Sequence, residues 1–372
     1  MSTIVDELYL KIDEGREGNN IGLKTGLPKL DLYTGGFQKG IYKLVFGNSG
    51  AGKSSYVIYS DIYRTLKDYP EKDIIHVYFS LEMSSSVLLS KILSLYVYEE
   101  FGVELSFMDL MSVKEKLSDS DYMYIQKARE WLESIANKFI IFDKPLNADS
   151  FYGAMMEIFK ANGTFSKTED GRRTIYTPNN SEQIINIVLD HAGLCQVAKG
   201  RSKKEEIDLI SSYCVRFREV CGASIDFIMQ ENRNASNIDR RKMDLSESTA
   251  EDIKDSGSPY NDCTQCIAVY YPLKHQIKTY RGYRVLDSSD GLDKGLGGAI
   301  RGLILLKNRF GNANKVFVSG FQGTIGRFVE LPKPEEINYE LYQSWKEEKI
   351  EDKKRDVFEC KTQENKKLSF KF

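Results

Sequence analysis

The chain has 372 residues, of which 41% are hydrophobic, enough for two or three domains or for one large α/β core. Its formal net charge is −2, so any contact with nucleic acid must come from a local patch and not from overall basicity. No signal-peptide core begins the chain, and no apolar run approaches the roughly 18 residues of a membrane span. These features argue against a secreted or membrane-spanning protein and predict a cytoplasmic location.

The six cysteines are scattered, and only Cys263 and Cys266 have C-x-x-C spacing. Two interpretations are open: a metal or redox site, or a pair of buried, reduced thiols. No second cysteine pair or nearby histidine completes a zinc site, which favours the thiols.

The first 20 residues predict a short helix that ends at the polar run 14–20. An isolated helix of this length is marginal in water and needs a surface to pack on. It either caps its own domain or docks on a neighbouring subunit, and both interpretations are open. Its apolar face consists of Ile4, Val5, Leu8, Tyr9 and Ile12.

From residue 22 onward, apolar runs alternate with helical stretches, a pattern typical of a mostly parallel sheet flanked by helices. The pattern predicts an α/β fold. The expected strands are 41–46, 74–80, 139–142, 184–189, 224–229, 266–271 and 302–307, with a hairpin at about 315–329. The expected helices are 53–67, 85–101, 120–137, 147–162 and 203–220.

Composition divides the chain into a helix and linker over 1–21, a core over 22–331 and a charged tail over 332–372. Two polar, turn-rich segments within the core are predicted insertions, at about 163–180 and 274–298. The first contains Asp170-Gly171, which favours a hairpin turn.

The segment 47–54 reads G-x-x-x-x-G-K-S between a predicted strand and a predicted helix. Its glycines let successive backbone N–H groups face a phosphate, and the helix adds its positive dipole end. In this pattern Lys53 reaches the β- and γ-phosphates and the Ser54 hydroxyl binds Mg²⁺. A glycine-rich surface loop is the alternative, but strand, loop and helix occur in the order that phosphate binding requires. The predicted phosphate-binding residues are Gly47, Asn48, Ser49, Gly50, Ala51, Gly52, Lys53 and Ser54.

Three polar residues follow predicted strands at the sheet edge where ligands bind in open α/β proteins. Asp190 ends the run 184–190 and is a candidate Mg²⁺ ligand, or else it caps the next helix. Glu82 follows the strand 74–80 and can polarise an attacking water, or else it is a first-turn glutamate favoured by a helix dipole. Gln230 follows the strand 224–229 and is a candidate γ-phosphate sensor, although this signal alone is weak.

Lys307 and Arg309 follow the predicted strand 302–307, and a period of two places them on the same side. Such cations can stabilise charge on the nucleotide of an adjacent subunit, as an arginine finger does. By spacing alone, the sequence favours an ordinary solvated pair over such a role.

Taken together, these motifs resemble the DnaB-type replicative DNA helicases, which have a RecA-like P-loop NTPase core. The similarity covers about residues 22–331, and its most specific parts are Phe-Ser-Leu-Glu-Met at 79–83 and Lys-x-Arg-x-Gly at 307–311. The matching segments occur in the family's order: 25–31 with Gly35, Gly36 and Gly40, then 47–54, 79–83, Asp190, 200–202 with Glu206 and Ile207, 230–233, 252–257 and 307–311.

The resemblance implies an ATP- and Mg²⁺-dependent enzyme that forms a homohexameric ring on single-stranded DNA and unwinds the duplex. It implies Lys53, Glu82 and Gln230 as catalytic groups, Ser54 and Asp190 as metal ligands, and Lys307 and Arg309 as groups donated by the neighbour. A primase or a helicase loader is an implied partner, in the cytoplasm of a bacterium or of a phage-infected host. The implied DNA-binding residues are Lys254, Asp255, Ser256 and Gly257 in one channel loop, and Arg201, Lys203 and Lys204 near another.

The sequence departs from the family pattern in three places. His191-Ala-Gly-Leu194 replaces the usual Tyr-Leu-Gln-Leu, and 258–262 lacks the usual acidic continuation. The phosphate loop begins at residue 47, so the family's usual N-terminal domain has no room before it. Two other functions therefore remain open: a RecA-like recombinase, and a non-translocating ATPase that acts as a scaffold or regulator.

Overall fold

A computed structural model describes residues 4–18, 20–232, 246–288 and 295–337. Parts of four predicted segments lie outside the described residues: residues 1–3 and 19 of the predicted N-terminal helix and linker, Arg233, residues 289–294 of the second predicted insertion, and residues 338–372 of the predicted tail. The helices are α1 (Ile4–Arg16), α2 (Pro28–Thr34), α3 (Lys53–Val57), the π-helix η1 (Ile58–Tyr63), α4 (Arg64–Asp68), α5 (Ser85–Phe101), α6 (Phe107–Leu110), α7 (Asp119–Ile135), α8 (Ala148–Asn162), α9 (Lys203–Cys221) and α11 (Ser258–Asp262). The strands are β1 (Tyr42–Gly47), β2 (Ile74–Ser80), β3 (Phe139–Phe142), β4 (Gly163–Lys167), β5 (Thr174–Pro178), β6 (Ile184–Asp190), β7 (Ser224–Gln230), β8 (Gln265–Tyr270), β9 (Thr279–Tyr280), β10 (Tyr283–Arg284), β11 (Ile300–Asn308), β12 (Lys315–Gln322) and β13 (Arg327–Glu330).

These elements form two compact units. Among the described residues, the first contains 4–18, 20–85, 137–232, 246–270 and 302–317, and the second contains 86–136, 271–288, 295–301 and 318–337. Every candidate site residue predicted from the sequence lies in the first unit.

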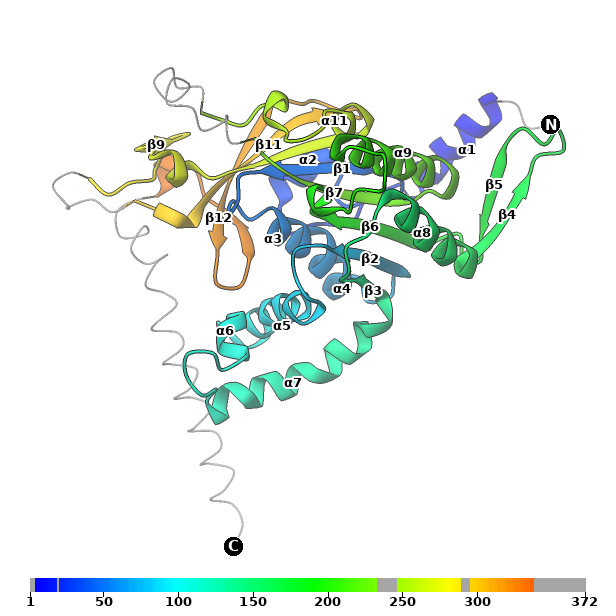
Figure 1. The fold of residues 1–372 in the computed structure, drawn as a ribbon. Helices are drawn as coiled ribbons and strands as arrows, with labels where there is room; N and C mark the ends of the chain where they lie inside the picture. The colour runs from blue at the N-terminus through cyan, green and yellow to red at the C-terminus, as the bar shows by residue number, and fades with distance from the viewer. Residues whose placement is uncertain (1–3, 19, 233–245, 289–294, 338–372) are drawn as a thin grey trace, which may run out of the picture. The chain divides into compact units, whose positions relative to one another are not determined.

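The main sheet has the strand order β13-β12-β11-β8-β1-β7-β6-β2-β3 (Figure 1). Strands β8, β1, β7, β6, β2 and β3 run parallel, and β11 runs antiparallel to β8. Every residue of β1 and β8 is buried, so both faces of these strands are covered, because successive side chains point to opposite faces. The predicted RecA-like α/β fold with a mostly parallel central sheet is confirmed.

The first predicted insertion contains the expected hairpin. Strands β4 and β5 pair with each other in a separate two-stranded sheet, and Gly171 in the turn has a φ of +69°. This left-handed conformation is one that glycine adopts without strain.

In the second unit, α5 and α7 share an apolar core, and the β12–β13 hairpin contacts α5. Gln322 donates a hydrogen bond to the Tyr98 hydroxyl at 3.2 Å, and Arg327 lies 3.5 Å from the Glu99 carboxylate. The buried members of the core are Val97, Val103, Leu105, Tyr124 and Ala128.

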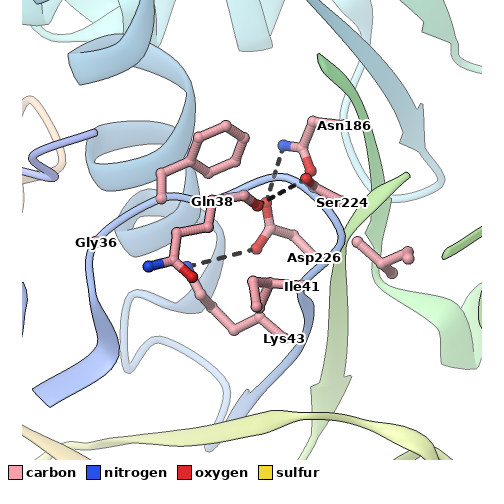
Figure 2. A pocket seen from close by; sticks show the side chains of 9 residues that line it. Gly36, Gln38, Ile41, Lys43, Asn186, Ser224 and Asp226 are labelled. Carbon is pink, nitrogen blue, oxygen red and sulfur yellow. Dashed lines mark hydrogen bonds and ion pairs between the residues drawn. The ribbon is translucent and has the colours of Figure 1, made fainter. Parts of the chain in front are cut away.

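A buried polar cluster crosses the first unit near the amino-terminal ends of its strands. Lys43 lies 2.5 Å from the Asp61 carboxylate and 3.9 Å from that of Asp226, which accepts a hydrogen bond from Asn186 at 3.0 Å. Figure 2 shows Lys43, Asn186 and Asp226 lining one small pocket. Burial, together with the negative charge of Asp61, raises the pKa of Asp226 well above its usual value.

His76 belongs to the same cluster, and its burial predicts that the stability of the fold depends on pH. Burial lowers the pKa of His76 to about 3, whereas histidine in an unfolded chain has a pKa of about 6.5. Between these values the unfolded state binds a proton that the folded state does not, so the free energy of unfolding falls as the pH falls below 6.5. We expect His76→Gln to remove roughly 1 to 2 kcal/mol of the stability loss between pH 7 and pH 5.

Urea unfolding of both proteins at the two pH values measures this difference. The same loss of stability in wild type and variant would contradict a neutral, buried His76.

Candidate nucleotide-binding site

The loop after β1 has the backbone that phosphate binding requires. Gly47 has a φ of +157°, and a Cβ at this position would lie 2.3 Å from the Val269 carbonyl oxygen, so only glycine fits. Gly52 has a φ of +99° and begins α3. Helix α3 continues into η1 and α4. The free N–H groups and the positive dipole end at the N-terminus of α3 face the loop.

Lys53 and Ser54 occupy the first turn of that helix. The Lys53 side chain is 8% exposed, and its Nζ donates a hydrogen bond to the Asn48 carbonyl at 3.0 Å, which folds it over the loop. The Ser54 hydroxyl donates to Asp190 Oδ1 at 2.8 Å. The loop and the end of β6 therefore meet at one point.

Asp190 is the last residue of β6 and is 1% exposed. Burial raises its pKa, while hydrogen bonds from Tyr78 at 2.5 Å and from Ser54 favour its charged form. The short helix that follows begins at Ala192 and has no side-chain cap, so the alternative role of Asp190 as a helix cap is wrong.

Glu82 lies just beyond β2, whose last residue Ser80 pairs in register with Asp190. Its side chain is 55% exposed, and its Oε2 lies 3.9 Å from His191 Nε2. Helix α5 begins only at Ser85 and has no acidic residue in its first turn, so the alternative role of Glu82 as a first-turn glutamate is wrong.

Gln230 ends β7 directly beside the phosphate loop. It pairs in register with Gly47, and its carbonyl accepts a hydrogen bond from the Lys254 N–H at 3.0 Å. Gln230 therefore lies between the candidate phosphate site and the loop 254–257.

Lys307 and Arg309 lie near the amino-terminal ends of the parallel strands, whereas the phosphate loop lies at their carboxyl ends. Because β11 is antiparallel to β8, Asn308 pairs with Gln265 at the start of β8, whereas Gly47 pairs with Val269 four residues later. Four strand residues span about 13 Å, so these cations lie far from the phosphate loop of their own chain. Both donate to the carbonyl oxygen of Asn261, at 2.9 Å and 2.8 Å.

Of the three predicted DNA-binding residues near α9, Arg201 and Lys203 contact other residues of the chain, whereas Lys204 faces solvent. Arg201 pairs with Asp149 at 3.0 Å and with Glu206 at 3.3 Å. Lys203 donates to the Cys195 carbonyl, and Lys204 is exposed. Contacts within the chain therefore account for Arg201 and Lys203 in this structure.

The loop 254–257 presents only part of its residues to solvent. Lys254 and Asp255 are exposed and form an ion pair at 3.8 Å, and Gly257 is also exposed. Ser256 is buried and donates to Asp208 on α9. Lys254 is thus the exposed cation of this loop.

The donor set fits a magnesium-bound nucleotide. The Ser54 hydroxyl and the Asp190 carboxylate are hard oxygen ligands of the kind Mg²⁺ prefers, and they already lie in hydrogen-bond contact. The loop N–H groups and Lys53 match phosphate oxygens. Among the residues that the structure describes, no group of three or more His, Cys, Asp or Glu side chains forms another candidate metal site, and Cys263 and Cys266 are free thiols.

Sequence reasoning missed the two side chains that surround Asp190 and Glu82. Tyr78 had a signal, since it is a polar-tipped residue inside an apolar strand that ends beside the site. His191 was noted only as a departure from the family pattern, and its contact with Glu82 depends on how the chain turns after β6.

The site predicts that removing the Lys53 cation disables nucleotide turnover. We expect Lys53→Ala to lower the hydrolysis of a nucleoside triphosphate by a factor on the order of 10² or more, because the phosphate charge loses its main cation. Phosphate release measures the rate, and Lys167→Ala in the exposed β4 is the control. Normal turnover by Lys53→Ala would contradict the assignment.

Comparisons with known proteins agree with this geometry. A family model described as the DnaB-like helicase C terminal domain matches residues 22–330. Comparison with curated protein sequences gives no match.

Two solved structures share the fold at 16% identity. The structure "ATPase Domain of G40P" has a TM-score of 0.65 and covers 88% of this chain and 99% of that chain. A DnaB-like replicative helicase, in a study of its interactions with primase, has a TM-score of 0.61, covering 89% of this chain and 68% of that chain. Since the family model matches most of the sequence, the chain belongs to the DnaB-like helicase family.

Proposed function

We propose that this protein is an ATP-dependent replicative DNA helicase. Its subunits form a homohexameric ring, which moves along single-stranded DNA and unwinds the duplex. The observation that carries this proposal is the division of the site between two edges of one sheet: the phosphate loop with Asp190 and Glu82 at one, Lys307 and Arg309 at the other. A head-to-tail contact between copies brings the two halves together, and repeating that contact closes a ring.

In the proposed reaction, each residue at the phosphate loop has one role. Lys53 and the loop N–H groups hold the phosphates, and Ser54 and Asp190 hold Mg²⁺, which supplies charge neutralisation when bound. Glu82 is exposed enough to reach a water molecule and orients it for attack on the γ-phosphate. Gln230 reports the state of that phosphate to the loop 254–257 through the backbone hydrogen bond to Lys254.

In the same proposal, Lys307 and Arg309 act on the nucleotide of the neighbouring subunit. Their distance from their own phosphate loop supports this role. Their shared acceptor, the Asn261 carbonyl, keeps both side chains on one side of the strand end.

Helix α1 supports contact between subunits. The side chain of Ile4 lies outside the described residues, and the other apolar side chains of this helix are between 47% and 62% exposed, so they are not packed on their own domain. This exposure favours docking on a neighbour over capping the domain. The exposed side chains are Val5, Leu8, Tyr9, Leu10 and Ile12.

We propose that Lys254 and Lys204 contact the DNA backbone, with Asp255 and Gly257 at the same loop. A few cations per subunit, repeated around a ring, are enough to track a strand of DNA despite a net charge of −2.

We further propose that a primase or a helicase loader is a partner of this protein and that it acts in the cytoplasm. None of the helices in the described residues has the length and hydropathy of a membrane span.

One observation favours the alternative of a non-translocating ATPase. The altered segment after Gly257 forms α11, which is tied to α9 by Asp262 through Ser211 at 2.6 Å and Arg218 at 3.2 Å. Such a segment has less freedom to follow DNA. In this alternative, hydrolysis does not respond to DNA.

Unwinding of a forked DNA duplex in the presence of ATP and Mg²⁺ tests the proposed function. We expect strand separation together with hydrolysis that single-stranded DNA stimulates. Hydrolysis without unwinding, indifferent to DNA across several salt concentrations, would instead support the regulatory ATPase.

Arg309→Ala tests whether a site is shared between subunits. The variant should bind nucleotide nearly normally but hydrolyse it slowly, by a factor of about 10³, because the transition-state charge loses its cation. Mixed into wild type in increasing amounts, it should reduce activity more than in proportion to its share. A strictly proportional loss would refute the role in the neighbour's site.

The role of α1 predicts a change of assembly. Leu8→Asp should shift the protein from a hexamer to smaller species, since burial of a charge at a subunit contact is unfavourable. Light scattering after size-exclusion chromatography measures the mass. Ile175→Asp, at a similarly exposed position of β5, is the control, and an unchanged mass of Leu8→Asp would contradict the contact.

A further inference from the structure

His191 lies between the proposed catalytic carboxylate and the proposed DNA-binding loop. Its Nε2 faces Glu82 Oε2 at 3.9 Å. On its other side is Asp255, the neighbour of Lys254. One imidazole therefore has a carboxylate near each of its two nitrogens.

Gly193 keeps open the space between His191 and Asp255. A Cβ added at Gly193 would lie 3.1 Å from His191 Nδ1 and 3.4 Å from Asp255 Oδ2. Both atoms thus border the same small gap, in which a methyl group would press on the imidazole, so the ring would have to move by a few tenths of an ångström. The φ of Gly193 is not among the positive values, so alanine introduces no backbone strain there.

The Nδ1 atom is a buried polar atom that faces this gap. His191 is 6% exposed, and its Nδ1 has no hydrogen-bond partner among the described residues. A buried nitrogen without a partner costs stability, so its retention points to a partner in another state of the protein. The Asp255 carboxylate, which borders the same gap, is a candidate for that partner.

Asp255 in turn forms an ion pair with Lys254. The Lys254 ammonium lies 3.8 Å from the same Oδ2 atom that borders the gap. A DNA phosphate that attracts Lys254 removes this cation from Asp255. The rest of the loop is anchored, by the Lys254 N–H to Gln230 and by Ser256 to Asp208, so a shift at Asp255 is local.

We propose that His191 is a positioning residue that transmits the binding of DNA at Lys254 to the Glu82 carboxylate. The proposal rests on the function proposed above and adds a route of regulation to that site. A neutral imidazole carries one N–H and donates it to one carboxylate at a time.

In the DNA-free state, the imidazole lies beside Glu82, with Nε2 3.9 Å from Glu82 Oε2, and limits the positions that this carboxylate can take. When a phosphate binds Lys254, the Asp255 carboxylate becomes free to accept a hydrogen bond from the imidazole across the gap. The ring then turns toward Asp255, and Glu82 is free to orient the attacking water.

The test compares kcat with and without saturating single-stranded DNA in wild type and three variants. Gly193→Ala fills the gap, and Asp255→Asn weakens the acceptor while suiting the φ of +70° at this position. Gly153→Ala in α8, where a Cβ meets nothing within 4 Å, is the matched control. The KM for ATP and the affinity for DNA, from fluorescence anisotropy, are measured in parallel.

We expect Gly193→Ala and Asp255→Asn to lower the stimulation by DNA about fivefold or more, the usual size of a coupling between sites. The DNA-free kcat and the KM of Gly193→Ala should stay near those of wild type. Asp255 lies in the proposed DNA-binding loop, so Asp255→Asn is compared with wild type only in its stimulation at saturating DNA. Gly153→Ala should behave as wild type. In Gly193→Ala, a merely structural role would change the KM, the DNA affinity or the folding transition instead.

Two outcomes distinguish a failure of the role of His191 from a failure of the proposed helicase function. Full stimulation of both variants at saturating DNA, in a wild type that DNA stimulates, would overturn the role of His191 and leave the helicase proposal intact. A wild type whose hydrolysis ignores DNA would overturn the proposed function, and with it this inference.

Discussion

The hydrogen bond from Ser54 to Asp190 depends on the arrangement of parallel strands, and the candidate site depends on that bond. Strands β1 and β6 are not neighbours in the sheet, since β7 lies between them. They run parallel, so their carboxyl ends reach the same edge, where a loop after one can meet a carboxylate at the end of the other. Ser80, in register with Asp190, leads to Glu82 at the same edge.

The antiparallel direction of β11 separates Lys307 and Arg309 from the phosphate loop. It reverses the direction of the chain beside β8 and carries Lys307 and Arg309 to the edge that the phosphate loop does not occupy. A single subunit therefore holds the two halves of the proposed site apart. Head-to-tail assembly is the arrangement in which both halves serve one nucleotide, which links the topology of one sheet to a ring.

The strand and helix pattern was largely readable from the sequence, because buried parallel strands are apolar runs and the helices between them are long. The phosphate loop was equally clear, since its glycines are a backbone requirement. The positions of Lys43, Asn186 and Asp226 carried a weaker signal. Each is a polar residue inside an apolar run, and register alone brings Lys43 opposite Asp226. The packing of His191 against Glu82 had no sequence signal, because it depends on side-chain direction after the strand ends.

The apolar face of α1 illustrates what the structure adds to helical periodicity. Periodicity indicates that such a face exists, and the structure adds that Val5, Leu8, Tyr9 and Ile12 on this face are exposed. In the same way, burial distinguishes Ser256 from Lys254 within one short loop.

The most direct test of this account is a structure of the protein with Mg²⁺, a non-hydrolysable ATP analogue and single-stranded DNA. We predict a metal held by Ser54 and Asp190, with Arg309 of the neighbouring subunit at the γ-phosphate of each occupied site in a closed ring. A nucleotide bound away from the phosphate loop, or sites completed within a single chain, would contradict it.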